Sequence, residues 1–122
     1  MARHTLTESF YYAIVGLVSV LISERNMRIH FLAMIVVVIF SFLVSISPLE
    51  WALLIITIFM VLIAETINTA VEKTVDLVTD TYHPLAKKAK NIAAGAVLLS
   101  AVNAVIIALI ILGPYLRQLI YS

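Results

Sequence analysis

The sequence predicts an all-α integral membrane fold, with three transmembrane helices and an N-terminal helix at the membrane interface. Two observations predict it. Hydrophobic residues make up 63% of the chain and charged residues 12%, whereas soluble domains carry about 25% charge. The hydrophobic residues also gather in segments long enough for a bilayer, which takes about 20 residues to cross. The 122 residues suffice for a single domain, 1–122.

Composition also excludes several classes of function. The net charge is +1, and no basic stripe is present that could follow a phosphate backbone, so we expect no nucleic-acid partner. The chain has no cysteine, which excludes disulfides and thiolate chemistry. The apolar stretch after Arg3 continues into the charged "SERNMR" without a cleavage site, so we expect no signal peptide.

The first element is a helix predicted over residues 5–23. Thr7 is the expected cap, and the acidic Glu8 suits a first helical turn. No residue is charged from Phe10 to Ser23, so this helix could also span the membrane. Spanning would invert the orientation of everything downstream, and we therefore expect a surface helix, although such helices usually show a strongly polar face.

Three spanning helices follow, predicted over 28–47, 49–79 and 84–117. The first and third contain long apolar runs, whereas the second is apolar only over its first half and must include the polar stretch "ETINTAVEKTVDLV" to cross. Pro48 and Pro84 separate the helices, because proline suits a first turn but cannot continue a preceding helix. Both connections are short, which favours antiparallel neighbours.

Basic residues predict the orientation. Positive charge accumulates on the cytoplasmic side of membrane proteins. The cations lie before the first span and between the second and third: Arg25, Arg28, Lys87, Lys88 and Lys90. The other side has Glu50 and a single Arg117. We expect the N-terminus and the 80–90 loop to face the cytoplasm, and the C-terminus to face outward.

The second span carries a stripe of polar side chains. Glu65, Asn68, Glu72 and Asp76 recur at helical spacing, which places them on one face. A helix end with solvated or lysine-paired carboxylates would explain Asp76. It explains Glu65 poorly, because this residue lies inside the apolar span, where a charge costs at least ~2.5 kcal/mol. Intramembrane ionisable residues are functional candidates by default.

A second polar cluster, "SERNMRIH", precedes the first span. It could simply be an interfacial anchor whose arginines pair with lipid headgroups. Glu24, however, can meet Glu72 at one membrane depth, with Lys90 nearby. Mg²⁺ usually binds one or two carboxylates together with substrate phosphates, so these residues have the chemistry of a magnesium–nucleotide site. No P-loop or glycine-rich kinase loop is present, and such a site would need a different fold.

The pieces "SERNMRIH", "ETINTAVEKTVD" and "HPLAKKAKNIAAGAVLL" resemble the bacterial diacylglycerol kinase family over about residues 9–116. These are integral-membrane lipid kinases, and the chain looks most like the Gram-positive branch, whose usual substrate is undecaprenol. The resemblance implies a homotrimeric helical bundle in the bacterial cell membrane. It also implies active sites at the cytoplasmic interface, shared between subunits, that transfer the γ-phosphate of ATP to a primary lipid hydroxyl.

The resemblance also implies roles for individual residues. Glu65 would take the proton from the lipid hydroxyl, with Asn68 supporting the reacting groups. Glu24 and Glu72 would bind Mg²⁺ on ATP. The remaining contacts to the nucleotide and its phosphates would come from Asp76, Lys90 and Asn91.

Two positions depart from the family pattern. Asn91 stands where the family normally has Asp, which keeps the shape, removes a charge and leads us to expect lowered turnover. The 10–23 helix lacks the charged residues that the family often carries there, so N-terminal nucleotide contacts are not expected from it.

Rival functions remain open at this stage. A diacylglycerol kinase would use the same site, because both lipids present a primary hydroxyl. A small oligomeric channel or transporter could use Glu65 and Asn103 to line a pore, but the acidic stripe lies at one membrane face instead of crossing it. A structural adaptor would leave Glu65 unexplained. His30 and His83 are expected to be interfacial hydrogen-bonding residues, since neither shows zinc-site spacing.

Overall fold

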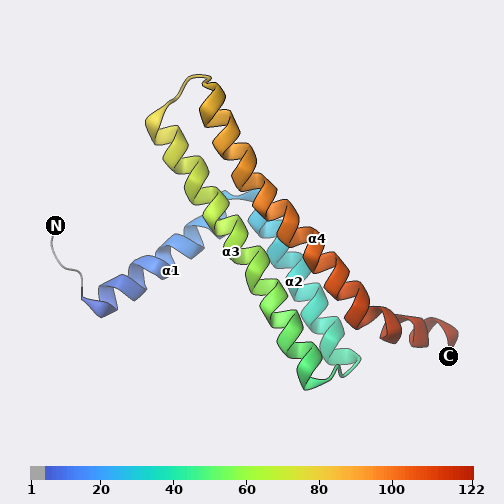
Figure 1. The fold of residues 1–122 in the computed structure, drawn as a ribbon. Coiled ribbons are helices and arrows are strands. Elements are labelled where there is room, and N and C mark those ends of the chain that lie inside the picture. Colours follow the sequence, from blue (N-terminus) through green and yellow to red (C-terminus); the bar gives the residue numbers. More distant parts are fainter. Residues whose placement is uncertain (1–4) are drawn as a thin grey trace.

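The computed structural model describes residues 5–122. This part of the chain forms four helices and contains no strand: α1 (Leu6–Ser23), α2 (Arg25–Leu43), α3 (Pro48–Val78) and α4 (Pro84–Tyr121). Figure 1 shows α2, α3 and α4 running side by side, while α1 leaves this bundle as an arm. The α3–α4 connection extends beyond the level at which α1 joins the bundle.

The N-terminus of α1 is set by a capping box. The Glu8 N–H donates to Thr5 Oγ1 at 3.3 Å, and the Thr5 N–H donates to Glu8 Oε2 at 2.7 Å. The prediction that Thr7 caps this helix is therefore wrong. The reciprocal bonds need an acidic or amide side chain three residues after the cap, which Thr5 has in Glu8, whereas Thr7 is followed at that distance by Phe10.

A second capping box begins α3. Pro48 occupies its first turn, as the sequence predicts, and Ser47 is the cap. The Ser47 N–H donates to Glu50 Oε2 at 2.8 Å, and the Glu50 N–H donates to Ser47 Oγ at 3.2 Å. The preceding turn from α2 is tight, with Ser45 in the left-handed region at φ 55°. These local interactions return the chain antiparallel to α2.

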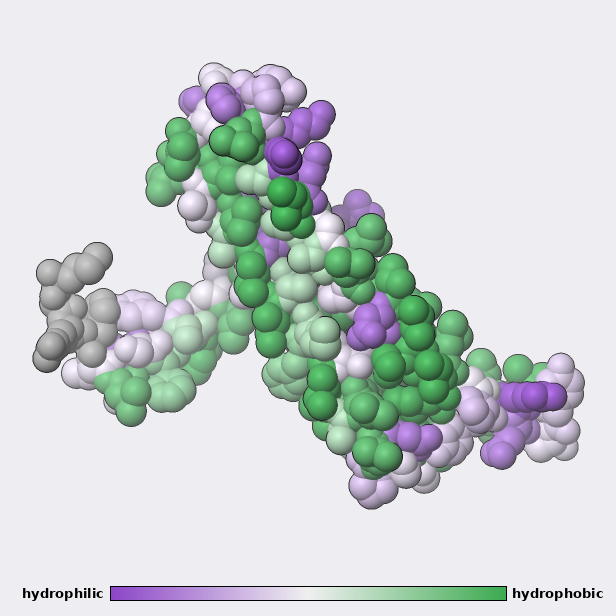
Figure 2. All heavy atoms as spheres, viewed as in Figure 1, coloured by the Kyte–Doolittle hydropathy of each residue, from purple (hydrophilic) through white to green (hydrophobic). Residues whose placement is uncertain are grey.

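Few side chains are buried among residues 5–122. A small core lies near the α2–α3 turn, where Ile46, Leu54 and Ile111 are buried. Elsewhere the outward faces of the helices are covered by apolar side chains (Figure 2), including Leu98 and Leu109, which are 65% and 66% exposed. Such faces suit a lipid environment, because there they contact acyl chains and not water.

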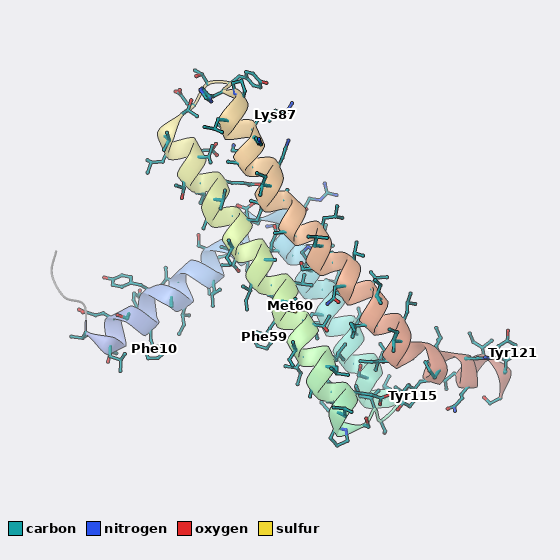
Figure 3. All side chains as sticks on the ribbon, viewed as in Figure 1. Phe10, Phe59, Met60, Lys87, Tyr115 and Tyr121 are labelled. Atoms are coloured by element: carbon teal, nitrogen blue, oxygen red, sulfur yellow. The ribbon has the colours of Figure 1, made fainter. Side chains whose placement is uncertain are left out.

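Hydropathy and length identify the chain as a membrane protein. Four helices in the described residues are long and apolar enough to cross a bilayer, one more than the three spans expected from the sequence. The additional candidate is α1, in which Val20 is the buried residue. Phe10 lies on the part of α1 that projects from the bundle (Figure 3). Length and hydropathy alone do not distinguish a spanning α1 from one at the membrane surface, so the surface position of α1 stays a prediction.

Helix ends differ from the predicted bounds by a few residues. The first bundle helix begins at Arg25 and ends at Leu43, earlier at both ends than 28–47, because the turn before Pro48 takes up residues 44–47. The last helix continues to Tyr121 although Pro114 lies inside it. Figure 1 shows that the end of α4 turns away from the bundle axis.

Candidate active site

The polar stripe of α3 is buried at its centre. Glu65 is 2% exposed, Asn68 6% and Thr69 2%. Within residues 5–122, no hydrogen-bond partner is present for Glu65 Oε2, Asn68 Oδ1 or Thr69 Oγ1. Leaving a buried polar group unsatisfied costs about 1–3 kcal/mol, and more for a charged one. Three such atoms on one helix face are therefore candidates to bind a substrate or a neighbouring subunit.

Glu65 is surrounded by other ionisable groups. Glu24, His30 and Glu72 all lie close enough to act electrostatically on its carboxyl group. They come from three places: the α1–α2 junction, the first turns of α2, and α3 itself. Three carboxylates near one another repel, so a bound cation would stabilise the arrangement.

Glu72 lies two helical turns from Glu65 on the same face. The Asn68 side-chain Nδ2 donates to Glu72 Oε1 at 3.2 Å, which links the buried part of the stripe to its more exposed part. The sequence prediction that Asn68 and Glu72 share a face is confirmed by this contact. Asn68 thereby orients a carboxylate while its own carbonyl oxygen stays available.

Glu24 is the single residue between α1 and α2, and it is the C-cap of one helix and the N-cap of the other. Ser23 Oγ donates to its Oε1 at 2.9 Å, and Lys73 Nζ lies 3.7 Å from the same oxygen. Arg28 steadies the junction by donating to the backbone carbonyl of Ile22. Lys73 follows Glu72 on α3, so this ion pair brings Glu24 to the part of α3 that carries Glu72. That Glu24 and Glu72 lie at one membrane depth stays a prediction.

The outer part of the site lies at the α3–α4 connection. Lys90 donates to Asp76 Oδ1 at 2.5 Å, so the two predicted nucleotide residues meet. Asn91 is exposed beside them. A hollow of about 330 Å³ is lined by polar residues of this region: Asp76, Asp80, Tyr82, His83, Lys87, Lys90 and Asn91. Figure 3 places Lys87 at this end of the molecule, and Figure 2 shows the hydrophilic surface around it.

An apolar cavity of about 290 Å³ lies between α2, α3 and α4. Its one ionisable lining residue is His30, and the other lining residues continue along the bundle to Leu54 and Ala108. His30 also acts electrostatically on Glu65, and it thereby connects the lining of the cavity with the buried carboxylate. Its shape and lining suit a hydrocarbon chain.

Glu24 and Glu72 have the donor chemistry of a magnesium site. Mg²⁺ takes oxygen ligands and commonly uses one or two carboxylates, with phosphates and waters completing the octahedron. No cluster of three or more potential metal ligands occurs among residues 5–122. The predicted site needs only two protein carboxylates, because phosphates and waters supply the other ligands. The carboxylate oxygens of Glu24 and Glu72 fit the chemistry of the group that the resemblance implies.

The sequence reasoning missed two features of the site. His30 was expected to be an interfacial hydrogen-bonding residue, and in the structure it lines an apolar cavity and acts electrostatically on Glu65. The sequence did not identify the lysine partners of the carboxylates, and among residues 5–122 Lys73 pairs with Glu24 and Lys90 with Asp76. Both features depend on how separate helices pack, which spacing within one helix cannot reveal. His83 does form a hydrogen bond, accepting from the Leu85 N–H.

Comparison with known proteins identifies the family of the chain. Residues 11–112 match the family described as prokaryotic diacylglycerol kinase. An undecaprenol kinase of Bacillus subtilis is 45% identical over 109 residues, which cover 89% of each chain. A diacylglycerol kinase of Synechocystis is 43% identical over 115 residues, 93% of this chain and 66% of that protein. A diacylglycerol kinase of Escherichia coli is 32% identical over 95 residues, 78% of each.

The family match covers both polar clusters and most of the bundle, and each of these relatives is named an undecaprenol kinase or a diacylglycerol kinase. A kinase family implies ATP as phosphate donor. The helical membrane fold and the buried acidic site are consistent with these similarities. The chain belongs to the prokaryotic diacylglycerol kinase family and is a lipid kinase.

Proposed function

We propose that this protein transfers the γ-phosphate of ATP to the primary hydroxyl of undecaprenol, forming undecaprenyl phosphate and ADP. The observation that carries the proposal is Glu65, a buried carboxylate with an unsatisfied oxygen. Two further glutamates act on it electrostatically, and so does His30, which lines an apolar cavity. The Bacillus relative that is named for undecaprenol supports this choice of lipid.

In the proposed reaction, Glu65 accepts the proton of the lipid hydroxyl as that oxygen attacks the γ-phosphorus. The bond between the γ-phosphorus and the β–γ bridging oxygen breaks, and ADP leaves with the bonding electrons. General-base catalysis of this kind contributes about 10²–10⁴-fold to a rate. Asn68 contributes by orienting Glu72 and by offering its free carbonyl oxygen near the reacting groups.

The metal and the nucleotide are assigned to the more exposed residues. Glu24 and Glu72 would hold Mg²⁺, which neutralises phosphate charge in phosphoryl transfer. Asp76, Lys90 and Asn91 would contact the nucleotide in the hollow at the α3–α4 connection, with Lys90 exchanging its bond to Asp76 for a phosphate. Positioning accounts for much of catalysis in this reaction class.

The lipid acceptor is assigned to the apolar cavity. A polyprenyl tail can lie along the bundle from His30 toward Leu54, with its hydroxyl near Glu65. A diacylglycerol presents the same kind of hydroxyl and is the alternative substrate, and the relatives named diacylglycerol kinase favour it.

The membrane placement follows from charge. We assign α2, α3 and α4 to spanning positions and α1 to the cytoplasmic surface of the bacterial cell membrane. The cations near Glu24 and in the α3–α4 connection support a cytoplasmic active site, where ATP is available. Residues 1–122 then form one integral-membrane kinase domain.

A homotrimer with shared sites is part of the proposal. A groove of about 620 Å³ lies between α3 and α4, lined by small residues such as Ala93 and Ala96 and by the polar Asn68, Ser100 and Asn103. Small residues allow helices to approach closely in membranes. A helix of a second subunit seated there would pack against the small residues and could hydrogen-bond to Ser100 and Asn103.

The test is an ATP-dependent phosphorylation assay with undecaprenol and diacylglycerol side by side in mixed micelles. Phosphate transfer should be faster to undecaprenol and should disappear in Glu65→Gln. Preference for diacylglycerol would reject the proposed lipid but keep the kinase site. Full activity of Glu65→Gln would reject the base, and ion flux through liposomes in the absence of ATP would favour a channel.

A further inference from the structure

The last turns of α4, residues 114–121, are not explained by the kinase reaction. They lie outside the residues that match the family, 11–112, and at the opposite end of the bundle from Glu65. They stay helical to Tyr121, yet they turn away from α2 and α3 (Figure 1). We name residues 114–121 the C-terminal segment.

The C-terminal segment is amphipathic. At 100° per residue, Leu116, Leu119 and Ile120 fall on one face of about 100°. The opposite face carries Arg117, Gln118 and Tyr121. The three apolar side chains are 49%, 61% and 66% exposed, so the described chain does not cover their face.

The segment begins at the membrane boundary. At a rise of about 1.5 Å per residue, the apolar stretch 92–112 is about 30 Å long, which equals the hydrocarbon thickness of a typical bilayer. The Tyr115 hydroxyl donates to Glu50 Oε2 at 2.8 Å, and Glu50 lies in the first turn of α3. This bond fixes the level at which polar groups resume on both helices (Figure 3).

Pro114 explains why the segment does not continue straight. Proline lacks an N–H, so the carbonyl of Ile110 loses its helical partner, and the ring clashes with the preceding turn and bends the helix. A straight helix would carry Leu116, Leu119 and Ile120 into water. A bent one can lie along the bilayer surface with these side chains in the lipid.

We propose that the C-terminal segment is a membrane-surface anchor, with its apolar face in the lipid and Arg117 at the lipid phosphates. Lipid is favoured as the occupant over a second copy because Arg117 is the one charge in the segment and complements phosphate. Tyr115 and Tyr121 belong to the residue types that gather at membrane–water boundaries. The apolar face also continues the lipid-exposed surface of α4, where Leu109 and Ile110 are each 66% exposed.

The chain has no cysteine, so single nitroxide labels can test this directly in the full-length protein. Leu119→Cys and Gln118→Cys place labels on the two opposite faces. Ile106→Cys serves as the bilayer reference and Thr81→Cys as the water reference. Each labelled protein is reconstituted in vesicles of phosphatidylcholine and phosphatidylglycerol, and collision rates with oxygen and with a water-soluble nickel chelate are measured by power saturation.

The label at position 119 should meet oxygen more often than nickel, approaching the Ile106 reference, while the label at 118 should resemble the Thr81 reference. Nickel access at 119 equal to that at 118 would overturn the proposal. A label at 119 shielded from both reagents would also overturn it, because that pattern indicates protein contact with a second copy. Adding Arg117→Gln to the 119 variant should reduce the lipid-inserted population about fivefold, and adding Pro114→Ala should raise nickel access.

Discussion

Two glutamates on α3 show how differently one helix can use the same side chain. Glu50, in the first turn, accepts hydrogen bonds from the Ser47 N–H and from the Tyr115 hydroxyl, both at 2.8 Å. Glu65 is buried, one of its oxygens has no partner within residues 5–122, and two more carboxylates act on it. The satisfied carboxylate ties helices together, whereas the unsatisfied one keeps its bonding capacity for a ligand.

The largest expected effect on activity is that of Glu65→Gln, compared with the same substitution at Glu50. Glu65→Gln should lower phosphorylation by at least about a hundredfold, because an amide cannot accept the substrate proton. Its thermal unfolding temperature should stay the same or rise, since a buried charge without a compensating partner destabilises a protein. Glu50→Gln is the matched control, and it should keep its activity while unfolding at a lower temperature. Equal activity losses in the two variants would remove the functional distinction between the carboxylates.

The next effect concerns the predicted magnesium residues. Glu24→Gln and Glu72→Gln should each raise the Mg²⁺ concentration that gives half the maximal rate by at least about tenfold, because each removes a charged ligand. Rates are measured in a Mg²⁺ titration at constant free ATP. Lys73→Gln breaks the ion pair with Glu24 without removing a ligand, and it serves as the control. A Mg²⁺ dependence unchanged in both glutamate variants would contradict the assignment.

A smaller effect on turnover is expected at Asn91, in the hollow at the α3–α4 connection. Asn91→Asp adds the charge that the family resemblance leads us to expect there and should raise turnover by up to about fivefold, since a single exposed charge contributes about 1 kcal/mol or less. Turnover is compared at saturating ATP and lipid. Lys88→Gln changes a nearby charge outside the hollow and is the control. Identical turnover with Asn and Asp would show that residue 91 does not take part in catalysis.

The smallest effect on activity is expected at Ser47, which caps the N-terminus of α3. Ser47→Ala removes the cap of α3 and should cost about 1 kcal/mol of stability, seen as a lower unfolding temperature in detergent. Phosphorylation at a temperature where the variant is folded should not change. Ser9→Ala, on the projecting α1, is a control outside the bundle. A loss of turnover in folded Ser47→Ala would mean that the two ends of α3 are coupled.

Much of this architecture could be predicted from single-helix patterns. Pro48 marks a helix start, and the spacing of the polar stripe predicts that Asn68 and Glu72 share a face, which their contact confirms. The electrostatic contact of His30 with Glu65 could not be predicted in this way, because it depends on how α2 packs against α3. The last helix was predicted to end at residue 117 and continues to Tyr121 with Pro114 inside it, since proline removes one backbone hydrogen bond and a bent helix can continue past it.

The junction residue Glu24 has a mechanical consequence. It separates α1 from α2 without a loop, and its own side chain makes no capping bond to the following helix. Any force that changes the tilt of α1 therefore reaches a proposed metal ligand directly, with no flexible residue to absorb it. Lateral pressure or headgroup crowding at the bilayer surface would then alter the geometry of the reaction centre. The enzyme could adjust its rate to the physical state of the membrane that contains its substrate.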